Sequence, residues 1–400
     1  MLTKLYLENT ISNILLFTKF ISANSKRLLA PCLLLLTACG GGSGSSSNNP
    51  GQTDNNPPSV PPISPVQCSR NDIGSELNVL LETIETDTDF SFYIENSLGN
   101  AYSFNRGNST LDTLYKSAST SKWVSAAAIL RLVDNGVLQL SDTPQTYLST
   151  AQWPLNASDS LYNITLSSLL SFTSGLINND SCSNSLAADF FECVTNIAIQ
   201  NADNTEVPGE QFYYGSNHLQ VAGAMAIVAG GYADWEALFN EFKSQTGLFA
   251  NSSYNLPSTN NPRLAGGMSW TGNDYINFIR SYKNAYIFSS TYMFDIATTD
   301  QIATASIENS PALSGIEEDW HYGYGLWIEC HLPEFTSTAC IPAKSVSSPG
   351  AYGAYPFLNI DKDYFGIIAR QGKLGTFRNG YLLFDSVQGK VDEWASCPNA

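Results

Sequence analysis

A stretch that is apolar almost all round follows residue 120. From Trp123 to Val133 only Ser125 and Arg131 interrupt it, which predicts a helix buried in the middle of the protein. Its three consecutive alanines favour helix, and Asp134-Asn135-Gly136 is a typical C-terminal stop. We therefore expect the rest of the chain to be organised around this helix.

Periodic and alternating patterns predict further elements on both sides of this helix. The predicted helices are 72–85, 164–170 (opened by Thr165), 217–229, 273–284 and 385–396. The predicted strands are 90–95 and 101–104, joined as a hairpin, and 352–360 and 364–369. Residues 141–310 contain mainly helices and long polar loops. This order predicts an α+β fold: an antiparallel β-sheet with pieces from both chain ends, flanked by N- and C-terminal helices, with an inserted all-helical region.

The N-terminal segment is typical of an exported protein. Lys26-Arg27 precede an apolar run, Leu28 to Leu36, which is too short to span a membrane and ends in small residues, as a secretory signal does. Leu36-Thr37-Ala38-Cys39 also resembles a bacterial lipobox, which implies cleavage before Cys39 and lipidation of its sulfur. The alternative is ordinary secretion with Cys39 incidental. We expect a lipid-anchored protein of the bacterial cell envelope, on its periplasmic or extracellular face.

A change in composition marks the domain boundaries. Residues 40–66 are rich in Gly, Ser, Asn and Pro and almost lack large apolar side chains, which is typical of a tether. We therefore expect a signal peptide at 1–38, a tether at 39–66 and one globular domain at 67–400. The net charge of −17 argues against a nucleic acid partner.

Six cysteines lie beyond the predicted tether, and an even number in an exported chain suggests disulfides. The pairs suggested by closeness in sequence are Cys182–Cys193 and Cys330–Cys340, which leaves Cys68–Cys397 to join the two ends of the domain. Metal binding is the competing interpretation. The chain has no Cys-x-x-Cys and only 3 histidines, so we expect neither a metal site nor a cofactor.

The N-terminal end of the predicted central helix carries candidate chemistry. Ser119 and Lys122 are three residues apart, so they share a helix face and the ammonium group can reach the hydroxyl. A buried helix N-terminus also offers free N–H groups and partial positive charge to a developing oxyanion. Ser-x-x-Lys alone is a weak signal in a serine-rich chain, so its interpretation depends on the rest of the sequence.

Three ordered segments resemble the serine β-lactamase and penicillin-binding-protein superfamily, class C type. They are 116–148 around Ser119 and Lys122, 164–176 ending in Thr-Ser-Gly-Leu, and 208–214, Pro-Gly-Glu-Gln-Phe-Tyr-Tyr. Together the similarity covers most of residues 70–395. It implies an acyl-transferring serine hydrolase that acts on a small-molecule or peptide-like ester or amide without histidine, metal or cofactor.

The resemblance assigns roles by position. Ser119 is the nucleophile, Lys122 is its activating partner, and Tyr214 opens a Tyr-x-Asn motif as the base or proton shuttle. The third position of that motif is Ser216 here, with Asn217 one residue further on, and we expect both to contact substrate.

The third family motif departs further from its pattern. Ser348-Pro349-Gly350-Ala351 stands where the family has Lys-Thr-Gly or His-x-Gly on an edge strand, so the cation is missing and Pro349 removes one donor. The Ala351 N–H would join that of Ser119 in an oxyanion hole. Penicillins carry a carboxylate beside the scissile bond, so we expect neutral esters to be better substrates than β-lactams. Arg370 or Arg378, on the late strands, could replace the missing charge.

Two rival functions stay open. One is a narrower enzyme, a β-lactamase or D,D-carboxypeptidase. The other is a non-catalytic protein that binds a cell-wall fragment or peptide, which would not require Ser119, Lys122 and Tyr214 together. A Ser-His-Asp triad fits less well, because there is no Gly-x-Ser-x-Gly motif and core or surface roles suit the histidines better. The histidines are His218, His321 and His331.

Overall fold

The computed structural model describes residues 68–177, 181–332 and 334–398. The predicted signal peptide, the predicted tether and Cys39 lie outside the described residues. Among the described residues, none of the helices combines the length and the apolar character needed to cross a membrane.

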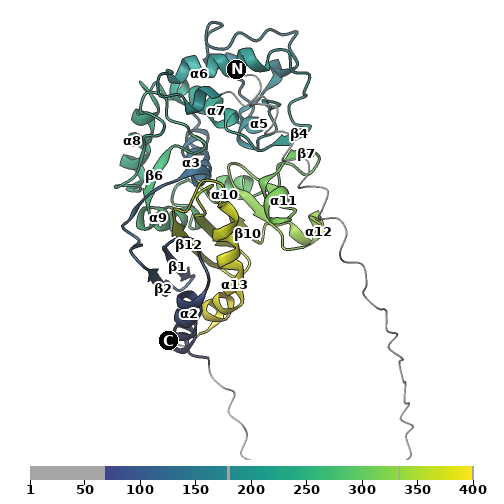
Figure 1. Cartoon of the computed structure of the whole chain (residues 1–400). Coiled ribbons are helices and arrows are strands. Elements are labelled where there is room, and N and C mark those ends of the chain that lie inside the picture. Colours follow the sequence, from purple (N-terminus) through teal and green to yellow (C-terminus); the bar gives the residue numbers. More distant parts are fainter. Residues whose placement is uncertain (1–67, 178–180, 333, 399–400) are drawn as a thin grey trace, which may run out of the picture. The chain divides into compact units, whose positions relative to one another are not determined.

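A seven-stranded antiparallel sheet is the framework of the described residues (Figure 1). Its strands are β1 (Phe90–Asn96), β2 (Ala101–Arg106), β8 (His321–Tyr322), β9 (Trp327–Glu329), β10 (Ser345–Ser347), β11 (Tyr355–Asn359) and β12 (Tyr364–Arg370). Their order across the sheet is β2-β1-β12-β11-β10-β9-β8. Strand β1 pairs with β12, so the two ends of the domain meet in the middle of one sheet. The predicted antiparallel sheet built from both ends, and its first hairpin, are confirmed.

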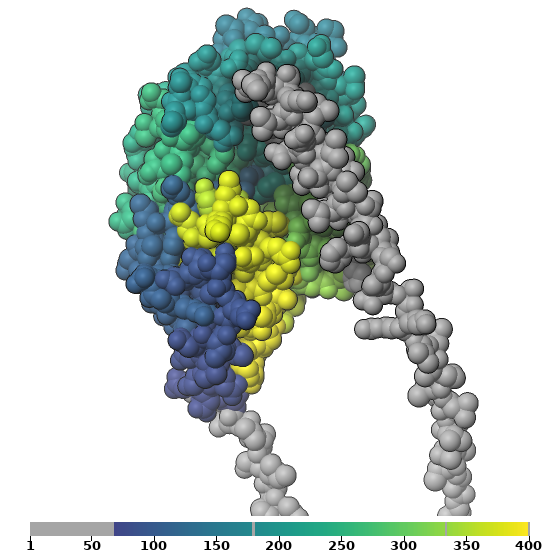
Figure 2. Space-filling view, in the orientation of Figure 1, coloured from purple at the N-terminus to yellow at the C-terminus, as the bar shows by residue number. Residues whose placement is uncertain are grey.

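Helices cover both faces of this sheet. They are α2 (Arg70–Thr83), α9 (Gly272–Lys283) and α13 (Phe377–Ser396). Tyr364 of β12 donates a hydrogen bond to Asp392 of α13 at 2.9 Å, whereas the next residue, Phe365, packs against Arg280 of α9. Because successive side chains of a strand point to opposite faces, α13 and α9 cover opposite sides. The first helix, α2, packs beside α13, where the purple and yellow ends of the domain meet (Figure 2).

Three disulfides hold the domain. The sulfur atoms join in the pairs that the sequence predicts: Cys68–Cys397, Cys182–Cys193 and Cys330–Cys340. The first connects the residues that flank α2 and α13, and the second closes a loop of the inserted region. The third follows strand β9 directly.

The inserted region between β2 and β8 contains helices and short strands. Apart from α9, its helices are α3 (Ser121–Asp134), α4 (Pro144–Tyr147), α5 (Leu166–Leu170), α6 (Phe190–Asn201), α7 (Asn217–Gly230), α8 (Trp235–Thr246), α10 (Thr291–Ala297) and α11 (Pro311–Ile316). Its strands are β3 (Leu114–Lys116), β4 (Gln211–Tyr213), β5 (Ser253–Tyr254), β6 (Met268–Thr271) and β7 (Ser306–Asn309). The insertion is mainly helical, as predicted, but its strands were not predicted, because strands this short leave no alternating pattern. One further helix, α12 (Ser337–Cys340), follows β9.

The predicted central helix is α3, and it is buried along almost its whole length. Its Trp123 packs edge-on against Phe278 and Tyr282 of α9, with ring centroids 5.6 and 5.3 Å apart. The helix ends at Asp134 with Asn135 as its C-cap, and Gly136 takes the left-handed conformation, with φ 72°, that the stop signal predicts. Helix α3 thus lies between the sheet-covering helix α9 and helix α7 of the inserted region.

Element boundaries differ most near the C-terminus. The helix predicted at 385–396 begins earlier, at Phe377. The prediction started too late because Gly380 weakens the helical pattern of the sequence before residue 385. A Cβ atom at Gly380 would lie 1.9 Å from the Gly353 carbonyl oxygen, so this glycine allows α13 to approach the sheet.

Strand β10 is not at an edge, since β8 and β9 extend the sheet beyond it. The prediction that Ser348 and Pro349 lie on an edge strand was therefore wrong: both follow the end of an internal strand.

Candidate active site

Ser119 occupies a single 3-10 turn, Ala118–Thr120, directly before α3. Ala118 adopts φ 47°, a left-handed conformation that non-glycine residues rarely take and that is often found at functional sites. Hydrogen bonds hold this turn: the Ser117 and Ser121 hydroxyls lie 2.6 Å apart, and Trp270 donates to the Thr120 hydroxyl at 2.8 Å. The surrounding structure therefore fixes the backbone that presents the Ser119 hydroxyl.

Lys122 lies one turn further along and is only 3% exposed. Its Nζ donates to Ser119 Oγ at 3.0 Å and to the Ala265 carbonyl oxygen at 2.9 Å. Burial, helped by the nearby charge of Arg263, lowers the pKa of Lys122 to about 7. A large share of this side chain is then a neutral amine at neutral pH, which can accept the Ser119 proton.

Tyr214 follows strand β4 and completes the group. Burial raises the pKa of Tyr214 to about 12, and hydrogen bonds with the side chains of Ser119 and Trp327 oppose that rise. Its ring stacks on Trp327 at 5.1 Å, and Lys122 Nζ lies 4.5 Å from the ring centroid. The phenol is thus protonated at neutral pH. Lys122 is suited to accept the first proton, and Tyr214 is suited to relay one.

The third motif contacts the nucleophile through its backbone and one hydroxyl. Ser348 Oγ donates to the Ser119 carbonyl oxygen at 3.1 Å, so this hydroxyl anchors the turn. A Cβ atom at Gly350 would lie 2.6 Å from the Ser117 carbonyl oxygen, which explains glycine at this position. Ala351 lies against the same cavity as Ser119, and among the described residues its N–H donates no hydrogen bond. That N–H is available to an oxyanion.

Two cavities meet at Ser119 and Tyr214. The first, of about 140 Å³, is apolar and is lined by Ser119, Tyr214, Pro311, Ala312, Trp320, Trp327, Pro349, Ala351 and Phe377. The second, of about 260 Å³, is polar and is lined by Ser119, Lys122, Ser183, Asn184, Tyr214, Gly215 and Ser216. We call them the apolar cavity and the polar cavity. Ser216 lines the polar cavity, whereas Asn217 lines neither, because it begins α7 and is fully buried.

Several lining residues carry no signal that sequence reasoning used. Trp320 and Trp327 belong to the β8–β9 hairpin, whereas Phe377 begins α13, so the three meet only in the folded protein. Ser183 and Asn184 lie in the loop that the Cys182–Cys193 disulfide closes, and that bridge was the one available hint. Among the described residues, no group of three His, Cys, Asp or Glu side chains is arranged to hold a metal ion.

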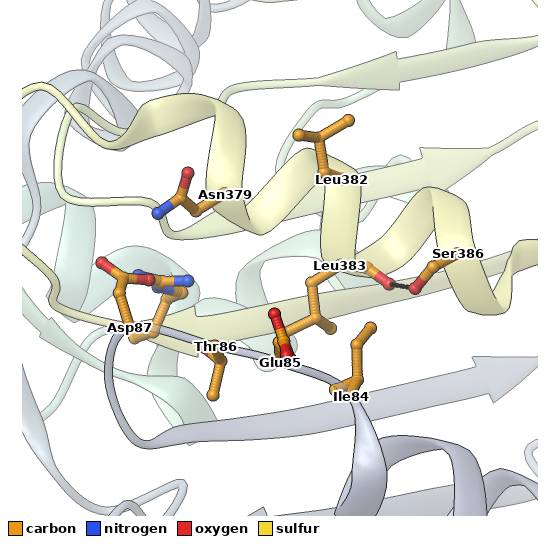
Figure 3. A pocket seen from close by; sticks show the side chains of 9 residues that line it. Ile84, Glu85, Thr86, Asp87, Asn379, Leu382, Leu383 and Ser386 are labelled. Carbon is orange, nitrogen blue, oxygen red and sulfur yellow. Dashed lines mark hydrogen bonds and ion pairs between the residues drawn. The ribbon is translucent and has the colours of Figure 1, made fainter.

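A larger cavity lies elsewhere, between the α2–β1 connection and α13 (Figure 3). It measures about 590 Å³ and contains neither Ser119 nor Lys122. Arg370 lines it and forms an ion pair with Asp87, which faces Asn379 in Figure 3. Arg378 is exposed near the start of α13. Arg370 and Arg378 therefore do not supply the missing charge in either cavity beside Ser119.

None of the three histidines contacts Ser119. His218 is buried, its ring nitrogens lie 2.8 Å from Ser174 Oγ and 2.9 Å from the Tyr213 carbonyl oxygen, and burial lowers its pKa to about 4. His321 pairs with Asp300 at 2.8 Å. His331 lies 3.7 Å from Glu329. The described residues thus form no Ser-His-Asp triad at this site.

Comparison with known proteins identifies relatives of this fold and site. The chain matches a family model described as beta-lactamase over residues 96–377. A candidate beta-lactamase from Bacteroides dorei DSM 17855 shares 26% sequence identity, with a TM-score of 0.65 over 80% of this chain and 98% of that chain. No curated protein matches.

Two more distant structures share the fold. The octameric penicillin-binding protein homologue from Pyrococcus abyssi is 17% identical, with a TM-score of 0.57 over 80% of this chain and 77% of that one. EstCE1, a hydrolase with promiscuous acyltransferase activity, is 15% identical, with a TM-score of 0.59 over 82% and 97%. Because the family model covers well over half of the sequence and the fold agrees, the chain belongs to the beta-lactamase family.

Proposed function

We propose that the protein is a serine hydrolase of class C type that forms an acyl-enzyme on Ser119 and prefers esters to β-lactams. The observation that carries this proposal is the 3.0 Å hydrogen bond between Ser119 Oγ and Lys122 Nζ, on a lysine that burial keeps partly neutral. A protein that only binds a cell-wall fragment or peptide would not need this arrangement, nor Tyr214 hydrogen-bonded to the same hydroxyl.

The reaction follows from where the protons can move. Lys122 accepts the Ser119 proton as Oγ attacks the ester carbonyl, and the Ser119 and Ala351 N–H groups stabilise the oxyanion. Lys122, through Tyr214, then returns a proton to the leaving oxygen as its bond to the acyl carbon breaks. Water attacks the acyl-enzyme in the second half, gives its proton to the same pair, and frees the Ser119 hydroxyl.

The preference for esters rests on the third motif and the apolar cavity. A β-lactam carboxylate would need a cation near Ser348, but Ser348 Oγ is engaged with the Ser119 carbonyl oxygen. Losing one charge-assisted contact costs about 1.5–3 kcal/mol, roughly tenfold to hundredfold in affinity. A short neutral acyl group instead fits among Trp320, Trp327 and Phe377.

The experiment compares kcat/KM for p-nitrophenyl acetate and butyrate with kcat/KM for nitrocefin, a cephalosporin. We expect clear turnover of the esters and poor turnover of nitrocefin. A preference for nitrocefin would reject the ester proposal and favour a β-lactamase. Release of D-alanine from a D-Ala-D-Ala peptide, faster than ester hydrolysis, would favour a D,D-carboxypeptidase.

We also propose that the protein is exported and anchored by a lipid on Cys39, motivated by Leu36-Thr37-Ala38-Cys39 and the Gly- and Pro-rich stretch after it. In a bacterial host the full-length chain should partition into the detergent phase, and Cys39→Ser should move it to the aqueous phase. Cys32→Ser is the matched control and should leave the partition unchanged. Equal partition of wild type and Cys39→Ser would reject lipidation.

A further inference from the structure

Arg263 lies beside the polar cavity, hydrogen-bonded to Asn184, which lines that cavity. Arg263 belongs to the segment between β5 and β6, and its guanidinium covers Gly266. A Cβ atom at Gly266 would lie 3.1 Å from Arg263 Nε and 3.2 Å from its Nη2. Gly266 directly follows Ala265, the residue whose carbonyl oxygen accepts the hydrogen bond of Lys122. The guanidinium is thus near enough to Lys122 for its positive charge to help lower the pKa of that lysine.

The contacts of Arg263 leave most of its donors available. Its Nη1 donates to the side-chain oxygen of Asn184, which lines the polar cavity. In the part of the chain that the structure describes, this is the only hydrogen bond of the guanidinium, and no carboxylate pairs with it. Arg280 and Arg370, by contrast, are paired with Glu95 and Asp87. A guanidinium carries five N–H donors, and a partly buried charge without a counterion is costly unless a ligand provides one.

The loop that bears Asn184 is held firmly against the segment that bears Arg263. The Cys182–Cys193 disulfide closes it. The Asn261 side chain, two residues before Arg263, donates to the Cys182 carbonyl oxygen at 2.8 Å. The side chains of Asn184 and Arg263 are therefore held together as a preformed pair beside the polar cavity.

The two cavities offer separate places for the acyl group and the leaving group of a substrate. A leaving oxygen must receive a proton, so it has to lie within reach of the group that carries one. Tyr214, which relays this proton, lines both cavities, but Lys122, which supplies it, lines only the polar cavity, so we place the leaving group in the polar cavity. The acyl group then occupies the apolar cavity. The far end of the leaving group then lies next to Asn184, and so next to Arg263, which is hydrogen-bonded to Asn184.

We propose that Arg263, with Asn184, binds a carboxylate on the leaving group, so that the preferred substrates are esters of hydroxy acids with a short apolar acyl group. This inference rests on the proposed function and specifies the substrate class of the same site. The carboxylate that Arg263 binds lies at the far end of the leaving group. It differs in position from the carboxylate of a β-lactam, which lies beside the scissile bond and near Ser348.

A matched pair of substrates tests this assignment. 4-Acetoxybenzoate and 4-acetoxybenzamide share the scissile bond and the ring, and differ by one charge at the far end of the leaving group. For the wild type we expect kcat/KM for the benzoate to exceed that for the benzamide by about tenfold or more, mainly through KM. Added salt should reduce the ratio. Each ratio is corrected for the slightly different reactivity of the two esters in buffer.

Substitutions assign the ratio to one residue. Arg263→Gln should bring the ratio close to one, and Arg263→Lys should keep part of the preference. Arg378→Gln removes the same charge from an exposed position on α13 and should keep the wild-type ratio. Because Arg263 also contributes to the low pKa of Lys122, both esters are measured at the same pH, where that effect cancels in the ratio.

Failure of this inference is distinguishable from failure of the proposed function. Equal losses for both esters in Arg263→Gln would mean that Arg263 only holds the 181–184 loop, and would overturn the inference. Ser119-dependent hydrolysis of both esters with a ratio near one in the wild type would overturn it too, while leaving the proposed function intact. If the wild type hydrolysed neither ester faster than Ser119→Ala does, the proposed function itself would fail. Thermal unfolding of each variant verifies that it is folded.

Discussion

Burial sets the roles of individual residues at this site. The same loss of water that lowers the pKa of Lys122 to about 7 raises that of Tyr214 to about 12, because one group is charged when protonated and the other when deprotonated. At neutral pH the lysine is therefore the side chain that can accept a proton, and the tyrosine is the one that can donate. Two groups in one pocket thus acquire complementary functions from a single physical cause.

The pH dependence of ester hydrolysis should follow Lys122. The active form is the neutral amine, so kcat/KM should rise with pH and level off above a midpoint near the pKa of about 7. Lys122→Arg keeps a proton at every accessible pH, so it should lose on the order of 100-fold in kcat/KM and lack the rise. Rates are measured from pH 5 to 9 with correction for spontaneous hydrolysis. A flat wild-type profile over this range would contradict the role of Lys122.

At this scale the sequence predicted the candidate catalytic residues, which the structure brings together, but not their surroundings. Ser119, Lys122 and Tyr214 stand in local motifs, so their roles could be inferred before any coordinates. Arg263 could not, because its relation to Lys122 depends on β5, β6 and the Asn184 loop coming together. Asn217 was misjudged for a related reason: adjacency to Ser216 suggested substrate contact, but the start of α7 places it in the core.

At the scale of elements, the active site depends on how closely the segment after β10 approaches the start of α3. Gly350 allows that approach, since the Ser117 carbonyl oxygen lies 2.6 Å and Thr120 Cγ2 3.0 Å from where its Cβ atom would be. The same segment carries Ala351, whose N–H is available to the oxyanion. The spacing between strand and helix thus sets the geometry of the proposed oxyanion hole.

Gly350→Ala should therefore impair catalysis more than folding. The added methyl group pushes Ala351 away from Ser119, and we expect kcat to fall by about tenfold or more, which is part of the roughly 100- to 1,000-fold that the complete loss of one oxyanion donor costs. Gly389→Ala is the control, because Gly389 lies on the exposed side of α13 and nothing is within 4 Å of its added Cβ atom. That variant should keep full activity and gain roughly 0.5–1 kcal/mol of stability. Normal kcat in Gly350→Ala would show that the two segments tolerate separation.

Elements with a clear pattern were predicted, and those without one were not. The hairpin, α3, α5, α7 and α9 have the periodicity, caps and turns that mark their bounds. Strands β8, β9 and β10 are two or three residues long and gain their identity only by pairing with one another. The resemblance placed the third motif at a sheet edge, but these unpredicted strands make β10 internal.

At the scale of the whole molecule, the two chain ends of the domain are joined three times. Strand β1 pairs with β12, α2 packs beside α13, and Cys68 is bonded to Cys397. The inserted region that carries Lys122 and Tyr214 therefore begins and ends in a part of the domain whose N- and C-terminal segments are fixed to each other. The sequence indicated this closure through the cysteine pairing and the late strands, although the exact register needed the structure.

Removing the terminal disulfide should destabilise the domain strongly. Cys68 and Cys397 are separated by 329 residues, and the loss of chain entropy that a disulfide imposes on the unfolded state grows with the length of the loop it closes. The Cys68→Ala/Cys397→Ala variant should therefore lose roughly 4–5 kcal/mol of unfolding free energy. This range lies below the chain-entropy estimate because measured losses often do. The Cys182→Ala/Cys193→Ala variant opens a loop with a separation of only 11 residues and should lose less, about 2–3 kcal/mol. Denaturant unfolding at constant pH measures both. A larger loss for the short loop would contradict the chain-entropy account.

The central claim is that Ser119 becomes acylated, and mass spectrometry of the acid-quenched reaction tests it most directly. After brief incubation with p-nitrophenyl butyrate, the intact wild type should gain the mass of one butyryl group, and peptide mapping should place it on Ser119. Ser119→Ala should gain nothing and should lose turnover, whereas the control Ser75→Ala, at an exposed serine of α2, should still be acylated. Butyryl groups on another residue, or undiminished turnover by Ser119→Ala, would contradict the account.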